Sequence, residues 1–209
     1  LGDVYKRQIL IGISCSAELK AQRNGTVYKG NDPAVRYTGR TLVSSDGSVA
    51  FDWVGTYLET RFTGGRLSVK VSETGTSYYN VFVDGKLHKV VKVCGTDTLI
   101  HLVSGIDKRI HSLKIQKRSE GEFGKTTIHQ FVLSGSGRLA EEPAVRTRHI
   151  EFIGNSLTCG YGTDGKHRDE PFLVETENCN LTFASMVARY YDADYTPVSY
   201  THLTLPTKR

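Results

Sequence analysis

The sequence predicts a mainly β protein, with an antiparallel β-sandwich of jelly-roll type over residues 22–142 and the truncated start of an α/β domain over residues 148–196. From about residue 25 to 139, short runs of alternating apolar and polar residues recur between Gly and Asp, without a long helical pattern. After Pro143 the pattern changes to a short apolar strand, a turn containing a serine, and a helix. That order opens an α/β domain, but the chain holds too few further strands to complete one.

The strands of the sandwich are located by their alternation. Leu67, Val69 and Val71 alternate with polar residues, which is typical of a strand with one buried face. Asp84-Gly85 lies between two further apolar runs, and this dipeptide favours a two-residue hairpin turn because glycine tolerates positive φ. The other expected strands lie in residues 51–62, 79–83, 87–93, 98–103, 109–118 and 127–133.

The two ends of the chain are expected to be foreign to the protein. Residues 1–8 and 197–209 can be back-translated into inverted complements of one sequencing-adapter sequence, so both are excluded from the fold. Excluding them reduces the count of Lys and Arg from 27 to 23 and that of Asp and Glu from 22 to 21. The remaining charge is close to balanced and does not indicate a nucleic-acid partner.

Residues 9–21 form a short apolar run that ends in small and polar residues. The run is too short to span a bilayer and is expected to be part of a signal peptide, which predicts a secreted or periplasmic protein. A lipoprotein cysteine at Cys15 and a buried first strand are the alternatives. After cleavage three cysteines remain, of which Cys159 and Cys179 are possible disulfide partners.

Several residues of the sandwich are candidates for sugar binding or metal binding. Trp53 is either a sugar-stacking platform or a core or interdomain residue, and its apolar neighbours on both faces favour packing. Lys117-Arg118, beside two glutamates, is expected to be a solvated strand end. Four histidines lie on separate strands without metal-binding spacing, so no metal and no cofactor are expected: His88, His101, His111 and His129.

The most informative motif follows the apolar strand at residues 149–153. Ser156 stands in a turn after Gly154 and Asn155, and Thr158, Gly160 and Gly162 follow it. A serine at the carboxyl end of a strand can be presented as a nucleophile. Residues 180–191 then have helical spacing, with Leu181, Ala184, Ala188 and Tyr191 on one face and Asn180 as the expected N-cap.

The Gly154-Asn155-Ser156 turn resembles the first motif of the SGNH (GDSL-type) hydrolases. Three other stretches narrow the resemblance to carbohydrate esterase family 2: residues 51–56 (Phe-Asp-Trp-Val-Gly-Thr), residues 78–85 (Tyr-Tyr-Asn-Val-Phe-Val-Asp-Gly) and residues 176–178 (Thr-Glu-Asn). The resemblance covers most of residues 25–195.

The resemblance implies a secreted, metal-independent esterase that removes acetyl groups from plant cell-wall polysaccharides of the xylan or mannan type. Ser156 would be the nucleophile, and its backbone N–H would help to bind the oxyanion. Asn155 stands where the family commonly has Asp, and Asn178 and Thr176 are interpreted as turn residues that brace the serine loop.

The catalytic histidine of the family lies near the C-terminus of its members, and no matching position is present in this chain. His167 lies in a polar loop and is not expected to replace it, so the chain itself is expected to be inactive. Two other functions stay open: a sandwich that binds glycan without chemistry, and another SGNH activity on lipid or thioester substrates. The sequence does not predict an oligomeric state.

Overall fold

The computed structural model of the protein describes residues 25–141 and 143–199. The expected adapter segment 1–8 and signal peptide 9–21, including Cys15, lie outside the described residues, and so does most of the expected C-terminal adapter segment. Pro197, Val198 and Ser199 are described, and the first two belong to the last strand of the structure.

Two six-stranded sheets form the first part of the protein, and every strand pair within them is antiparallel. One sheet has the order β3-β4-β11-β6-β9, with β1 also paired to β11. Its strands are β1 (Thr26–Lys29), β3 (Leu42–Val43), β4 (Val49–Phe51), β6 (Arg66–Glu73), β9 (Thr98–Ser104) and β11 (Thr126–Leu133). The mainly β, antiparallel fold is therefore confirmed.

The second sheet has the order β12-β5-β10-β7-β8, with β2 also paired to β5. Its strands are β2 (Val35–Thr38), β5 (Tyr57–Thr63), β7 (Thr76–Val83), β8 (Lys86–Cys94), β10 (His111–Lys117) and β12 (Arg138–Leu139). The expected strand at residues 51–62 is two strands, β4 and β5, because the chain turns between them with a hydrogen bond from Thr56 N–H to the Trp53 carbonyl.

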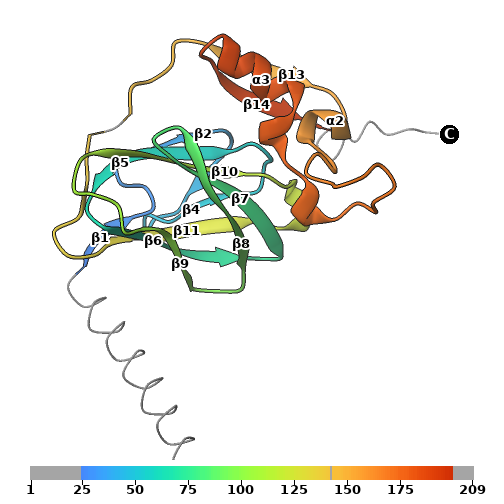
Figure 1. Cartoon of the computed structure of the whole chain (residues 1–209). Coiled ribbons are helices and arrows are strands. Elements are labelled where there is room, and N and C mark those ends of the chain that lie inside the picture. The colour runs from blue at the N-terminus through green and yellow to red at the C-terminus, as the bar shows by residue number, and fades with distance from the viewer. Residues whose placement is uncertain (1–24, 142, 200–209) are drawn as a thin grey trace, which may run out of the picture.

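The two sheets pack face to face, as Figure 1 shows, and enclose the main apolar core. The predicted alternation in β6 is confirmed, since Leu67, Val69 and Val71 are each 3% exposed or less. Each such side chain contributes roughly 1.5–3 kcal/mol by burial. Asp84 and Gly85 both have positive φ, 50° and 75°, which is the backbone of the predicted hairpin turn between β7 and β8.

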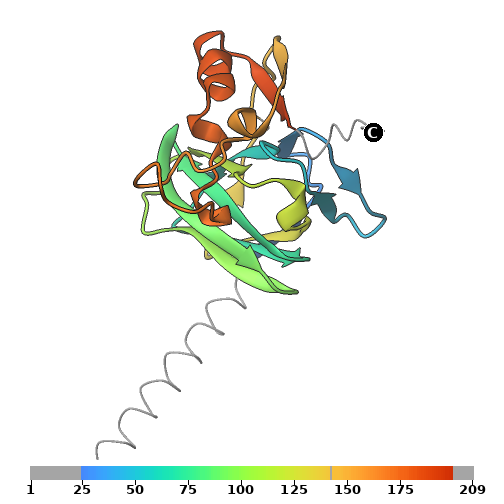
Figure 2. The same cartoon turned by 90° about the vertical axis from the view of Figure 1, so that its right-hand side faces the viewer.

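The second part of the protein packs against one side of the sandwich (Figures 1 and 2). It consists of β13 (His149–Ile153), α2 (Ser156–Cys159), the 3₁₀ turns η2 (Val174–Thr176) and η3 (Cys179–Leu181), α3 (Phe183–Tyr190) and β14 (Asp194–Val198). A further 3₁₀ turn, η1 (Gly121–Phe123), precedes β11 in the sandwich. Strand β14 returns parallel to β13, so this part is a strand–helix–strand unit.

The expected helix over residues 180–191 is shorter in the structure, and the predicted N-cap is wrong. Asn178 accepts a hydrogen bond from the Asn180 N–H at 3.2 Å and starts η3, after which Thr182 is extended and begins α3. Ala184 and Ala188 are buried as predicted. Leu181 and Tyr191 are 42% and 51% exposed, and both lie outside α3: Leu181 belongs to η3, and Tyr191 follows the last residue of the helix.

No helix within the described ranges is both long and apolar enough to cross a membrane.

Candidate active site

An apolar cluster joins the sandwich to the second part of the protein. It contains Trp53 and Val54 from the sandwich and Cys159, Cys179 and Val198 from the second part. The Trp53 ring is 8% exposed, and its Nε1 donates to the Pro197 carbonyl at 3.0 Å. The prediction that Trp53 serves packing is confirmed, and a sugar cannot stack on a ring buried in this way.

The two cysteines of this cluster are free thiols, so the disulfide considered for them is not formed. Both are fully buried. Burial raises the pKa of Cys179 to about 12 and also holds the pKa of Cys159 above its usual range. Both thiols are therefore protonated at neutral pH and act as small apolar residues.

Ser156 is the first residue of α2, directly after the strand β13 and the Gly154-Asn155 turn. Asn155 is the N-cap of that short helix, and its side-chain Oδ1 accepts a hydrogen bond from the Leu157 N–H at 3.1 Å. An aspartate would accept the same bond, so the asparagine keeps the local geometry while it removes the charge. Ser156 itself is half-buried.

The serine loop closes tightly on the segment that follows it. Gly160 has a φ of 88°, and a Cβ at this position would lie 2.5 Å from the carbonyl oxygen of Asn178. The Asn178 N–H donates to the Gly160 carbonyl at 2.9 Å, and the Thr163 hydroxyl donates to the carbonyls of both residues at 2.9 and 3.0 Å. Only glycine allows this approach of two backbone segments.

Asn178 also connects the loop to the sandwich. Its Oδ1 accepts from Asn80 Nδ2 at 2.9 Å, and its Nδ2 donates to Asp164 at 3.1 Å. The residue predicted to brace the loop thus contacts three different segments. Thr176 ends η2, and its hydroxyl donates to the Leu173 carbonyl at 2.8 Å. Its backbone carbonyl accepts from the Asp164 N–H at 3.0 Å, so Thr176 also contacts the loop that follows Ser156.

The expectation that Lys117-Arg118 is a solvated strand end is wrong. Both residues are buried: the second part of the protein covers Arg118, whereas the Lys117 side chain lies against residues of the sandwich. Arg118 donates to the carbonyls of Glu175 and Glu177 at 3.0 Å each and pairs with the Asp164 carboxylate. The Lys117 ammonium donates to Ser77 Oγ at 2.5 Å and to the Gly124 carbonyl at 3.1 Å.

Glu177 is fully buried. One carboxylate oxygen accepts from the Glu120 N–H at 3.2 Å, and the other has no partner. Burial, and then the neighbouring Glu120, raises the pKa of Glu177 to about 8. Glu175, by contrast, is exposed and accepts from the Tyr78 hydroxyl at 3.2 Å.

Within residues 25–141 and 143–199, no histidine forms a hydrogen bond to Ser156. His167 is exposed and lines a separate cavity of 290 Å³ with Tyr161 and Phe172. Three of the four sandwich histidines bind local partners: His101 contacts Ser68, His129 contacts Ser72, and His111 contacts Asp84 and Asp107. No three His, Cys, Asp or Glu side chains gather as a metal site in the described part of the chain.

The fold and the site together define a class: a β-sandwich joined to an α/β unit that presents a serine after its first strand. The family model described as "Carbohydrate esterase 2 N-terminal" matches residues 37–143, from within β2 to the linker. The chain belongs to carbohydrate esterase family 2.

Known relatives agree with this assignment. The chain is 31% identical over 175 residues to the cellulase/esterase CelE of Acetivibrio thermocellus, covering 84% of this chain and 21% of the relative. It is 30% identical to an acetylxylan esterase / glucomannan deacetylase of Cellvibrio japonicus, covering 78% of this chain and 45% of the relative.

A solved structure of a family two carbohydrate esterase has a similar fold. An active-site mutant of a family two carbohydrate esterase from Clostridium thermocellum superimposes with a TM-score of 0.76 at 31% identity, covering 80% of this chain and 51% of that one. The chain thus spans about half or less of the length of each of these relatives, from 21% to 51%.

Proposed function

We propose that Ser156 is the nucleophile of an esterase that removes acetyl groups from polysaccharides. The observation that carries the proposal is the position of Ser156 at the carboxyl end of β13, in the chain of a carbohydrate esterase family. The serine hydroxyl would attack the ester carbonyl, the sugar alcohol would leave, and an acetyl-serine would form. Water would then hydrolyse this ester, and acetate would be released.

The backbone at Ser156 supports the same chemistry. The N–H of a first helical residue has no partner within its helix, and Ser156 holds that position in α2. This N–H can donate to the oxyanion that forms when the hydroxyl of the same residue attacks. Removal of one such donor typically costs about 3–4 kcal/mol in the barrier.

The general base is proposed to lie in the part of the relatives that this chain does not span. Ser156 has no imidazole partner in the described residues, and an unassisted serine hydroxyl is a weak nucleophile. The 209-residue polypeptide is therefore expected to release no acetate from acetylated xylan at enzymatic rates.

The test compares this chain with a longer polypeptide that also contains the downstream half of a family member. The longer protein is expected to release acetate, and Ser156→Ala should lower kcat about 10⁴-fold or more. Ser104→Ala, at the exposed end of β9, is the matched control and should leave the rate unchanged. Full turnover by the Ser156→Ala protein would exclude Ser156 as the nucleophile.

The substrate is proposed to be acetylated polysaccharide of the xylan or mannan type, since a relative is named acetylxylan esterase / glucomannan deacetylase. Export to the periplasm or the medium is proposed from the apolar residues 9–21, and it suits a polymer outside the cell. Acetate release from acetylated xylan and glucomannan, measured side by side, identifies the preferred polymer. Release from neither polymer, with retention of xylan by the chain, would favour a glycan-binding module.

A further inference from the structure

A second cavity lies between the sandwich and the second part of the protein, and the serine loop does not line it. Its volume is 380 Å³, at the lower end of the range of small-molecule sites. Strands β5 and β10, the β7–β8 hairpin, the linker, η3 and α3 all contribute to its wall. Its lining residues are Glu59, Thr60, Phe82, Gly85, Ser112, Leu113, Lys114, Pro143, Arg146, Asn180 and Arg189.

The charges in this cavity are unbalanced. Its lining holds three cationic side chains, Lys114, Arg146 and Arg189, against the single carboxylate of Glu59. That carboxylate is already neutralised, because it accepts from Arg146 at 3.3 Å and pairs with Arg36 behind the cavity wall. Two positive charges in the lining therefore have no compensating anion there.

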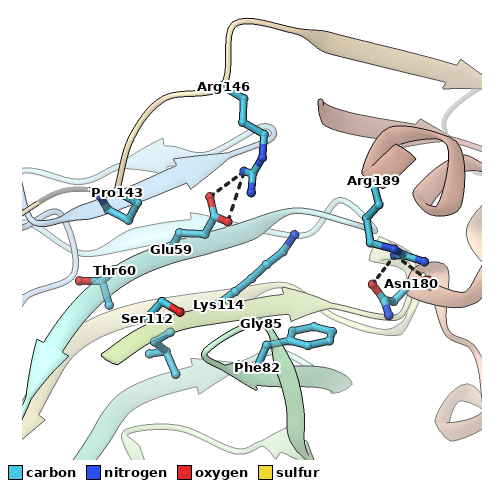
Figure 3. A pocket seen from close by; sticks show the side chains of 11 residues that line it. Glu59, Thr60, Phe82, Gly85, Ser112, Lys114, Pro143, Arg146, Asn180 and Arg189 are labelled. Atoms are coloured by element: carbon cyan, nitrogen blue, oxygen red, sulfur yellow. Dashed lines mark hydrogen bonds and ion pairs between the residues drawn. The ribbon is translucent and has the colours of Figure 1, made fainter. Parts of the chain in front are cut away.

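Lys114 is the most informative of these cations. Figure 3 shows its side chain reaching into the space between the Glu59–Arg146 pair and Arg189. Within the described chain its ammonium has no hydrogen-bond or ion-pair partner, and its contact is with the Tyr57 ring, 3.7 Å from the ring centroid. An ammonium that is largely removed from water without an acceptor is costly, and an anion would supply the missing partner.

Arg189 completes the cationic side of the cavity. Its guanidinium donates to the backbone carbonyl and to the side-chain oxygen of Asn180, at 3.1 and 3.0 Å, and both acceptors are neutral. The remaining N–H donors of the Arg189 guanidinium can bind a carboxylate. Phe82, Leu113 and Pro143 supply apolar wall, which suits the C–H face of a sugar ring.

We propose that this cavity binds the carboxylate of a uronic-acid residue, with Lys114 and Arg189 as its charged ligands and the apolar wall against the ring. A free small carboxylate such as acetate has the same charged group but would leave most of the cavity unfilled. The site is separate from Ser156 and would hold an acidic branch or end of a glycan while an ester elsewhere on it is cleaved. It therefore adds a recognition element to the proposed esterase.

The proposal is tested with the 209-residue protein by isothermal titration at neutral pH. Glucuronate is expected to bind, glucose to show no binding at the same concentration, and acetate to bind at least tenfold more weakly than glucuronate. Lys114→Met and Arg189→Gln are each expected to weaken glucuronate binding about tenfold or more. Lys92→Met, an exposed lysine of β8 outside the cavity, is the matched control and should bind as the unmodified protein does.

Several results would overturn the proposal. These are no binding of glucuronate, equal binding of glucose or acetate, or glucuronate binding that neither cavity variant changes. Arg189 is exposed, so Arg189→Gln is expected to fold even if Lys114→Met does not. Ser156→Ala should bind glucuronate normally, which separates a failure of this site from a failure of the esterase assignment.

Discussion

The side-chain amide of Asn80 donates a 2.9 Å hydrogen bond to Oδ1 of Asn178, although 98 residues separate the two in sequence. Asn80 lies on β7 of the sandwich, and the backbone N–H of Asn178 binds the Gly160 carbonyl of the serine loop. Both side chains are buried. Asn178 is thus one of the residues that connect the sandwich to the nucleophile loop.

Asn178→Ala is expected to destabilise the protein by about 1–3 kcal/mol, because it removes the 2.9 Å acceptor of the buried Asn80 amide and one of the donors to Asp164. Urea unfolding measures the change. Asn31→Ala, at an exposed position of the sandwich, is the control and should change the free energy of unfolding by less than about 0.5 kcal/mol. Equal effects of the two substitutions would contradict the bracing role.

Gly160→Ala and Gly162→Ala form a matched pair. Both glycines have positive φ, 88° and 67°, so both alanines carry the strain of the left-handed region, about 1 kcal/mol. Only at Gly160 would the new Cβ meet backbone, 2.5 Å from the Asn178 oxygen, whereas nothing lies within 4 Å at Gly162. Thermal unfolding should show a clearly larger loss for Gly160→Ala, and the reverse order would refute the described loop geometry.

Glu177 should make stability depend on pH. Its pKa is raised from 4.5 to about 8, so the folded protein retains a proton that the unfolded chain loses. The stabilising contribution of this proton is complete below about pH 4.5 and is lost as the pH rises to about 8. Glu177→Gln should give a flatter profile over this window and higher stability at pH 8.

The measurement is the free energy of unfolding in urea at several pH values between 4.5 and 8. The difference between the two ends of the window is on the order of 3 kcal/mol for a fully buried group. Glu141→Gln, at an exposed position, is the control and should keep the slope of the unmodified protein. A profile of Glu177→Gln that parallels that of the unmodified protein would argue against a protonated Glu177.

Lys114 has the opposite dependence. Burial, the largest cause, and nearby Arg146 lower its pKa from 10.5 to about 8, although Glu59 acts against them. The folded protein therefore releases this proton before the unfolded chain does, and stability should rise between about pH 8 and 10.5. Lys114→Met is expected to be more stable than the unmodified protein at pH 7 and to show a shallower rise.

Thermal unfolding at pH 7, 8.5 and 10 checks this prediction, with Lys92→Met as the exposed control. If Lys114→Met melted at a lower temperature than the unmodified protein at pH 7, the Lys114 ammonium would stabilise the fold, contrary to the prediction. If Lys114→Met is more stable but binds glucuronate more weakly, then Lys114 lowers the stability of the protein and serves binding.

Patterns among near neighbours in the sequence were sufficient to predict part of the fold. The alternation of Leu67, Val69 and Val71 located β6, and Asp84-Gly85 predicted the hairpin between β7 and β8, because side-chain period and turn chemistry act over a few residues. The turn that presents Ser156 could likewise be recognised from its glycines and its preceding strand. The same local residues carried the resemblance to carbohydrate esterase family 2, which the family match confirmed.

The burial of polar residues, in contrast, depends on contacts between segments that are distant in the sequence. Lys117 and Arg118 appeared to be solvated, yet the carbonyl of Glu177, 59 residues further along, accepts from Arg118 and covers it. The position at which η3 starts likewise depends on Asn178, whose side chain accepts a hydrogen bond from Asn80 on β7 of the sandwich. Burial of a charge depends on which distant segment covers it, and neither period nor composition carries that information.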